Sequence, residues 1–150
     1  NNINLREVIK NTNALIIGAS AGSMNSADIV YAQPELDGES IDPNYKKYIK
    51  GLGLTNISIL PHFEQSLDYT LDGKNIFKEI SLPDSMIRPF IAYSDGAFIY
   101  DNRESQLMYG KAYLFDDGSY QQISEDNAIT DITELVNYKF SNSDYNLIKE

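Results

Sequence analysis

A serine between two glycines is the first group in this sequence that could do chemistry. Gly18-Ala19-Ser20-Ala21-Gly22 follows the apolar run Ala14–Ile17, a predicted buried strand, and leads into a predicted helix over Ala21–Val30. A strand, a tight turn that carries a serine, and a helix together form the context of a nucleophile elbow. The residues of the turn are small because large side chains would clash with the backbone there. The turn would expose the Ser20 hydroxyl and aim the Ala21 N–H at an oxyanion. A glycine-rich connection that only packs closely, or that cradles a phosphate, is an equal alternative on this motif alone.

A base for that serine is available in the only histidine of the chain, His62. Serine is a poor nucleophile until a base removes its proton, and histidine is the usual base at neutral pH. His62 follows the apolar segment Leu54–Leu60, which Pro61 ends. We therefore expect the histidine and the serine at the same carboxyl edge of a parallel sheet. A purely structural histidine is the alternative.

Three carboxylates compete for the third role, which is to hold the imidazole in one tautomer and to stabilise its protonated form. Asp95 is our choice because it follows a third apolar segment, Arg88–Ser94. Glu35 and Glu64 are the competitors. Glu64 lies only two residues from the histidine and would point away from its ring in extended backbone.

Composition limits the classes of function. The chain has 150 residues, enough for one domain, with 42% hydrophobic residues, and 12 basic against 22 acidic residues give a net charge of −10. This charge disfavours binding to nucleic acid or to an anionic membrane. There is no cysteine, and a single histidine argues against zinc, so we expect neither metal nor cofactor. No apolar run reaches the roughly 20 residues of a membrane span, and the polar start of the sequence leads us to expect a cytoplasmic protein.

The order of apolar segments and turns predicts the elements that must position these groups: an α/β arrangement in the N-terminal part of the chain and antiparallel strands in the C-terminal part. An amphipathic helix is expected over Asn1–Asn13. The acidic loop Tyr31–Tyr45 is either a solvated surface loop or a flap bordering the site. Two hairpins are expected, one joining Arg88–Ser94 to Ala97–Tyr100 through Asp95-Gly96 and one joining Leu107–Phe115 to Ser119–Ile123.

Together these motifs resemble the peptidase E/cyanophycinase family of serine peptidases. Gly18–Ser23 resembles the serine elbow of that family, and Gly51–Leu54 followed by Ile59–Phe63 resembles its glycine–leucine segment and Pro-His-aromatic motif. Asp95-Gly96 resembles the segment with the triad carboxylate, where some members have glutamate. The similarity extends from Leu15 to Phe115.

This resemblance implies roles for the residues and a fold for the chain. Ser20 would be the nucleophile, His62 the general base and Asp95 its orienting acid, with the Ala21 N–H as half of an oxyanion hole. The fold would be class I glutamine amidotransferase-like: a partly parallel sheet flanked by helices, with C-terminal antiparallel hairpins.

The family has a long α/β portion before its elbow, whereas only 19 residues precede the serine here. We therefore expect residues 1–150 to be a single domain and the C-terminal portion of a longer peptidase E-like domain. The missing N-terminal portion or a homodimer partner would then associate with it.

The leading hypothesis is a serine peptidase acting on short peptides, with N-terminal Asp-Xaa dipeptides as one candidate. Between His62 and Met86 only Lys74 and Lys78 are basic. Cyanophycin cleavage is therefore disfavoured, and no arginine supports recognition of aspartate. The alternative is a non-catalytic α/β binding or interaction module that retains the serine elbow. An amidotransferase-like glutaminase ranks last because that chemistry uses cysteine at the elbow.

Overall fold

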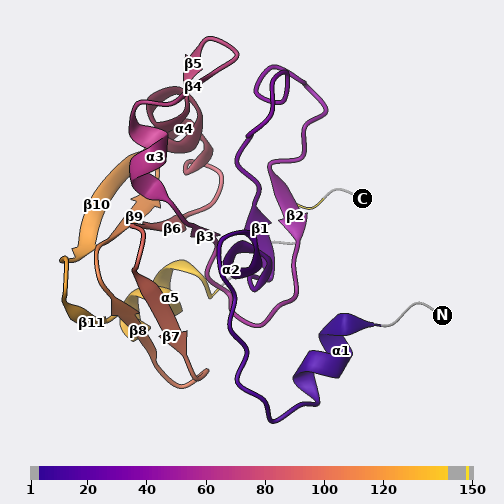
Figure 1. Cartoon of the computed structure of the whole chain (residues 1–150), viewed down its shortest axis with the longest axis vertical. Helices are drawn as coiled ribbons and strands as arrows, with labels where there is room; N and C mark the ends of the chain where they lie inside the picture. Colours follow the sequence, from indigo (N-terminus) through magenta and orange to yellow (C-terminus); the bar gives the residue numbers. More distant parts are fainter. Residues whose placement is uncertain (1–3, 142–147, 149–150) are drawn as a thin grey trace.

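The core is built on a four-stranded mixed sheet with the strand order β10-β9-β6-β3, seen in Figure 1. The computed structural model describes residues 4–141 and 148. β3 (Ile59–Leu60) runs parallel to β6 (Phe90–Tyr93), and β9 (Ala112–Asp116) pairs antiparallel with β6 and with β10 (Ser119–Ser124). A mixed sheet with helices and antiparallel strands confirms the α/β class. The more specific glutamine amidotransferase-like topology stays a prediction.

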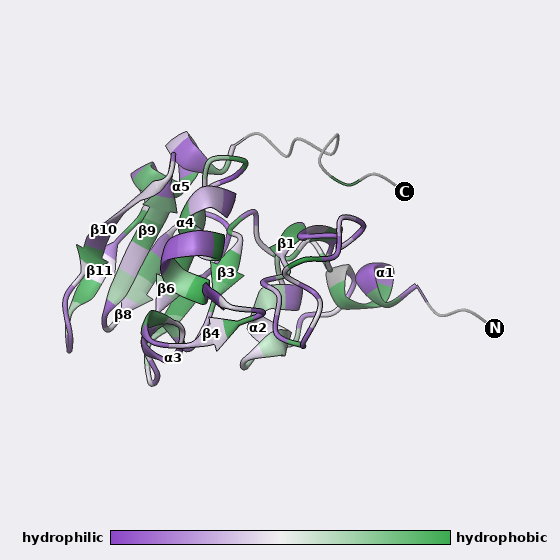
Figure 2. Ribbon diagram, turned by 90° about the horizontal axis from the view of Figure 1, so that it is seen from above, coloured by the Kyte–Doolittle hydropathy of each residue, from purple (hydrophilic) through white to green (hydrophobic). Residues whose placement is uncertain are grey.

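Side chains of this sheet alternate between two apolar clusters, as the period of two along a strand requires. In β6, Phe90 and Ala92 belong to one cluster and Ile91 to the other. The first cluster also holds aromatic residues of the helical segments after β3, and the second holds residues of the C-terminal helix. Figure 2 shows the apolar colour on β6 and β3 and, paler, on β9. The sheet is therefore covered on both faces, which fixes the strand ends that carry the site.

The remaining elements surround this sheet. β1 (Ile29–Tyr31) pairs antiparallel with β2 (Tyr48–Lys50), and β4 (Thr70–Leu71) with β5 (Lys74–Asn75). A second sheet has the order β11-β8-β7. Its strands are β7 (Phe98–Asp101), β8 (Gln106–Tyr109) and β11 (Ile129–Asp131). The helices of the described chain are α1 (Leu5–Lys10), α2 (Ala21–Asn25), α3 (Phe63–Leu67), the π-helix η1 (Ile76–Ser81), α4 (Leu82–Asp84) and α5 (Thr133–Lys139). Among the described residues no helix combines the length and apolar content needed to cross a membrane.

The N-terminal helix is shorter than predicted. α1 begins after Asn4, whose side chain accepts a hydrogen bond from the N–H of Glu7, and residues 1–3 of the predicted helix lie outside the described residues. α1 stands apart from the sheets in Figure 1. Arg6 ties it to the rest of the molecule, because its guanidinium lies 2.6 Å from the Asp28 carboxylate and donates to the backbone oxygen of Leu52.

The prediction of a buried strand at Ala14–Ile17 is wrong. The segment forms no strand, and Leu15 and Ile17 are 78% and 82% exposed. β3 is the edge strand of its sheet, and the ladder it forms is with β6, not with this segment. A run of apolar residues becomes a strand only where a neighbour satisfies its backbone, and among the residues described here none does.

Two neighbouring predictions need shorter bounds. The helix predicted over Ala21–Val30 ends at Asn25, because the β-branched Ile29 and Val30 belong to β1. The strand predicted over Leu54–Leu60 is reduced to Ile59–Leu60. Both changes keep Ser20 at the start of a helix and His62 just after a strand.

The first predicted hairpin is wrong and the second is confirmed in its main part. β6 and β7 do not pair, since β6 lies between β3 and β9 while β7 pairs with β8 in the other sheet. Asp95-Gly96 is therefore a connection between two sheets, which leaves Asp95 at the carboxyl end of β6. β9 and β10 form the second hairpin, although Gly110, with a φ of +87°, separates β8 from it.

Candidate active site

Ser20 occupies a sharp turn directly before α2. Its φ of 49° and ψ of −123° are rare for a residue with a side chain, and such backbone is held only when the surroundings determine it. A Cβ atom on Gly18 would lie 2.6 Å from the backbone oxygen of Gly22, whereas one on Gly22 would meet nothing within 4 Å. The expectation that both glycines are needed for space is therefore correct for Gly18 and wrong for Gly22.

The backbone after the serine is arranged so that one amide stays available. The N–H of Gly22 donates to the oxygen of Ala19, and the N–H of Ser23 donates to the oxygen of Ser20. The Ala21 N–H makes no hydrogen bond to any residue that the structure describes. It can therefore donate to a negatively charged oxygen forming beside Ser20.

His62 follows β3 and faces the serine. Its φ of 60° and ψ of 38° put it in the left-handed region, a second strained position at the site. Its Nε2 lies 3.0 Å from the Oγ of Ser20, within hydrogen-bond reach. The two side chains come from positions 42 residues apart in the chain.

Asp95 contacts the other nitrogen of the imidazole ring, Nδ1. Because β3 and β6 are parallel, their carboxyl ends meet at one edge of the sheet and bring His62 and Asp95 together. A carboxylate only accepts hydrogen bonds, so Nδ1 carries the proton and Nε2 is left to accept the hydroxyl proton of Ser20. The imidazole and the carboxylate are 42% and 65% exposed, so solvent reaches this pair.

The structure thus brings Ser20, His62 and Asp95 together in the order a catalytic triad requires. Neither competing carboxylate is bonded to the imidazole: Glu64 accepts a hydrogen bond from the Ser94 hydroxyl, and among the described residues the ring nitrogens pair with Asp95 and Ser20, not with Glu35. The catalytic roles of the three residues stay predictions. Within the described part of the chain, no three His, Cys, Asp or Glu side chains gather as ligands for a metal ion.

A cavity of about 390 Å³ opens beside the serine and the histidine. This volume falls in the range of small-ligand sites. Pro61 and Gln65 contribute to one part of its lining, and Gln33, Pro34 and Glu35 come from the loop between β1 and β2. The alternative of a flap bordering the site therefore holds for this part of the acidic loop. Sequence reasoning did not find the two glutamines, since a lone amide carries no motif.

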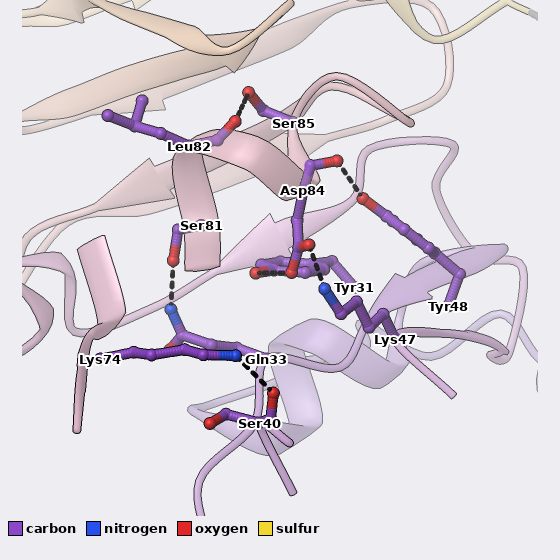
Figure 3. A network of polar contacts seen from close by, with 10 residues as sticks. All are labelled: Tyr31, Gln33, Ser40, Lys47, Tyr48, Lys74, Ser81, Leu82, Asp84 and Ser85. Carbon is purple, nitrogen blue, oxygen red and sulfur yellow. Dashed lines mark hydrogen bonds and ion pairs between the residues drawn. The ribbon is translucent and has the colours of Figure 1, made fainter. Parts of the chain in front are cut away.

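We call Gln33, Pro34 and Glu35 the loop wall of the cavity. The ends of the loop that carries them are anchored by a buried polar network, drawn in Figure 3. Tyr31 and Asp84 are buried, and the Tyr31 hydroxyl donates to the Asp84 carboxylate over 2.9 Å. Lys47 Nζ lies 2.5 Å from the same carboxylate, and the Tyr48 hydroxyl donates to the Asp84 backbone oxygen. Burial, and then the negative charge of Asp84, raise the pKa of Tyr31 and of Tyr48, so both hydroxyls remain donors. Gln33 is held at the cavity because its amide donates to the Ser81 hydroxyl over 2.6 Å.

Comparison with protein families gives a match to Peptidase family S51 over residues 2–105, well over half of the chain. The chain belongs to this family. No curated protein and no solved structure matches it. The expectation of membership in the peptidase E/cyanophycinase family is thereby confirmed, and the family supports a peptidase activity.

The matched range of this S51 chain contains Ser20, His62 and Asp95 together with the loop wall. The C-terminal part, from β8 onward, lies outside it. That part supplies β9, the antiparallel neighbour that covers the free side of β6. The strand that positions Asp95 is therefore held partly by residues beyond the matched range.

Proposed function

We propose that this S51 chain is the catalytic part of a serine peptidase that hydrolyses short peptides through Ser20, His62 and Asp95. Ser20 Oγ attacks the scissile carbonyl carbon while its proton passes to Nε2 of His62. Asp95 stabilises the imidazolium, and the Ala21 N–H donates to the oxyanion. The protonated histidine then gives its proton to the leaving amine. Water, activated by the same histidine, hydrolyses the acyl-enzyme and restores the serine.

The observation that carries this proposal is the 3.0 Å between Ser20 Oγ and His62 Nε2, with Asp95 on the opposite ring nitrogen. The pair fixes both the tautomer and the direction of proton transfer. General-base assistance of this kind contributes roughly 10²–10⁴-fold to the rate. The strained backbone at both residues is a second support, because such strain collects at functional sites.

Labelling with a fluorophosphonate tests the nucleophile directly. We expect the wild-type protein to be labelled at Ser20 and the Ser20→Ala variant to remain unlabelled. Ser26→Ala is the matched control, because Ser26 is a half-buried serine just after α2 that does not line this cavity. Equal labelling of wild type and Ser20→Ala would contradict the proposal.

A second candidate is the non-catalytic binding module, and the exposure of the His62–Asp95 pair is the observation that favours it. Solvent weakens an exposed ion pair, and the imidazole is then held less firmly for proton transfer. No labelling of Ser20 in a folded protein would favour the module over the peptidase.

We also propose that further polypeptide covers the exposed run Leu15–Ile17, either an N-terminal portion of the same protein or a homodimer partner. This run is exposed, and its backbone pairs with no strand among residues 4–141, so it is a template for another strand. Such a partner would supply the second N–H of the oxyanion hole that the family resemblance implies. The labelling rate of the 150-residue chain is therefore compared with that of the native product, after its intact mass and oligomeric state are measured. A larger or dimeric native product that labels faster is the expected result.

A further inference from the structure

The carboxyl end of β6 carries more than the candidate triad acid. Tyr93, the last residue of β6, and Ser94 stand directly before Asp95, and both are half-buried. Each has a hydroxyl that reaches another element of the site: the Tyr93 hydroxyl interacts with a side chain of α2, and the Ser94 hydroxyl with a side chain of α3. Because α2 follows Ser20 and α3 follows His62, this segment is connected to both other members of the candidate triad.

The contact of Tyr93 leads to the backbone of Ser20 through one side chain. Ser23 is buried in α2, and its hydroxyl donates to the backbone oxygen of Ser20 over 2.6 Å. Because the Ser23 hydroxyl uses its proton in this bond, its oxygen is left to accept from Tyr93. Burial raises the pKa of Tyr93, so its hydroxyl stays protonated and can donate. The turn of the nucleophile is thereby connected to the central sheet, although the run before it, Ala14–Ile17, forms no strand.

Ser94 connects β6 to the start of α3. Its hydroxyl donates to the carboxylate of Glu64, which lies in the first turn of α3, two residues after His62. Its N–H donates to the backbone oxygen of Lys111 over 3.1 Å, and its own backbone oxygen accepts from the N–H of Ala97 over 3.1 Å. Ser94 is thus fixed to the segment that leads into β9, and it closes the turn that carries the candidate triad acid.

We propose that Tyr93 and Ser94 are positioning residues of this site. Tyr93 holds the nucleophile at hydrogen-bond distance from the imidazole, and Ser94 holds the imidazole against its carboxylate. The inference rests on the proposed peptidase function and names further residues on which that function depends. The imidazole and the carboxylate are both open to solvent, so their own contact holds them weakly. Supporting hydrogen bonds keep such groups in productive geometry, and a displacement of about 1 Å can cost about a hundredfold in rate.

Removal of each hydroxyl tests the assignment. Tyr93→Phe and Ser94→Ala keep the rest of the side chain, and Glu64→Ala breaks the Ser94 contact from an exposed residue. The matched controls are Tyr109→Phe, from a half-buried tyrosine of β8, and Ser105→Ala, from a half-buried serine between β7 and β8. The rate of fluorophosphonate labelling measures the reactivity of the nucleophile. The imidazole NMR signals of the single histidine measure its contacts, and far-UV circular dichroism verifies that each variant is folded.

We expect Tyr93→Phe, Ser94→Ala and Glu64→Ala to slow labelling by about tenfold or more, with both controls like wild type. Tyr93→Phe should move the imidazole signals toward those of Ser20→Ala. Added to Ser20→Ala it should move them no further, because the partner of Nε2 is already gone. Ser94→Ala and Glu64→Ala should instead move the signals toward those of Asp95→Ala, and should have no further effect in that background. A residue that only supports the fold would change the signals in every background.

Labelling and imidazole signals like wild type in Tyr93→Phe, or a signal change that persists in Ser20→Ala, refute the role of Tyr93. The same results in Ser94→Ala or Glu64→Ala, with Asp95→Ala as the background, refute the role of Ser94. The two proposals fail separately. Labelled Ser20 with variants like wild type refutes positioning alone, and the expected signal changes without any labelling refute catalysis alone.

Discussion

Removing the Tyr31 hydroxyl tests whether the buried network holds the cavity wall. In Tyr31→Phe the ring, which stacks on Phe90 with centroids 4.5 Å apart, is retained. The hydroxyl is lost, and with it the hydrogen bond to Asp84 and the interaction with the Ser81 side chain. Tyr31 is fully buried and Asp84 is 2% exposed, so no water replaces the donor. The variant therefore measures the hydroxyl's hydrogen bonds, and comparison with an Asp84 variant isolates the share that depends on the buried charge.

The expected magnitude follows from the partners. A hydrogen bond to a charged group contributes roughly 1.5–3 kcal/mol, so Tyr31→Phe should lower the free energy of unfolding by that amount. Asp84→Ala removes the acceptor of Tyr31 and the partner of Lys47, which costs about 3–5 kcal/mol for a buried pair. The Lys47 side chain is 38% exposed and regains solvent, which favours the lower end of that range. In the double variant the tyrosine substitution should cost little more, because its acceptor is already gone.

Urea unfolding followed by far-UV circular dichroism measures all four proteins, and the chain has no tryptophan for fluorescence. Tyr138→Phe is the control, since that ring is 79% exposed and its hydroxyl can bind water in either state. The reasoning is refuted if the two single effects add fully in the double variant. It is also refuted if Tyr31→Phe changes the free energy of unfolding no more than Tyr138→Phe does.

Two further predictions concern the elbow and the acidic loop. Gly18→Ala should abolish labelling of Ser20, because the new Cβ would lie 2.6 Å from the backbone oxygen of Gly22. Gly22→Ala should be labelled like wild type, because its Cβ would meet nothing within 4 Å. Equal labelling of the two variants would contradict the packing argument. Backbone N–H donors lower the pKa of Glu39 and of Asp72. These carboxylates therefore stabilise the loop between β1 and β2 at any pH above the ordinary carboxyl pKa. The stabilisation is lost as the pH falls through the lowered pKa values. Amide exchange in that loop, corrected for its intrinsic rate, should therefore accelerate below about pH 4, and an unchanged corrected rate would refute the link.

The sequence sufficed to single out Ser20, His62 and Asp95 as candidates because each follows an apolar segment and carries a side chain of distinct chemistry. Ser20 lies in a small-residue turn, and His62 is the only histidine. The Asp95-Gly96 dipeptide also suits a hairpin turn, so its local pattern does not distinguish the two roles. Only the parallel pairing of β3 with β6 shows that Asp95 lies beside the histidine. Parallel pairing joins distant segments, and local patterns carry little information about it.

The cavity wall could not be predicted for a different reason. Asp84 follows a proline and suggests an ordinary turn, yet it is the centre of a buried network with Tyr31 and Lys47. A buried carboxylate is stable only with partners, and these partners come from a loop and a strand far away in the sequence. The exposed Ala14–Ile17 run is the converse case. Its apolar pattern predicts a buried strand, but burial depends on a neighbour that the pattern cannot specify.

The two halves of the site differ in what holds them. His62 and Asp95 follow strands of the central sheet, and paired strands fix their positions on one side. Ser20 is held on its C-terminal side by α2, where the Ser23 hydroxyl donates to its backbone oxygen over 2.6 Å. On its N-terminal side the chain enters from the unpaired, exposed run that ends at Ile17. Polypeptide that pairs with that run would therefore bear on the position of Ser20 before it bears on that of His62 or Asp95, whose strands are already paired.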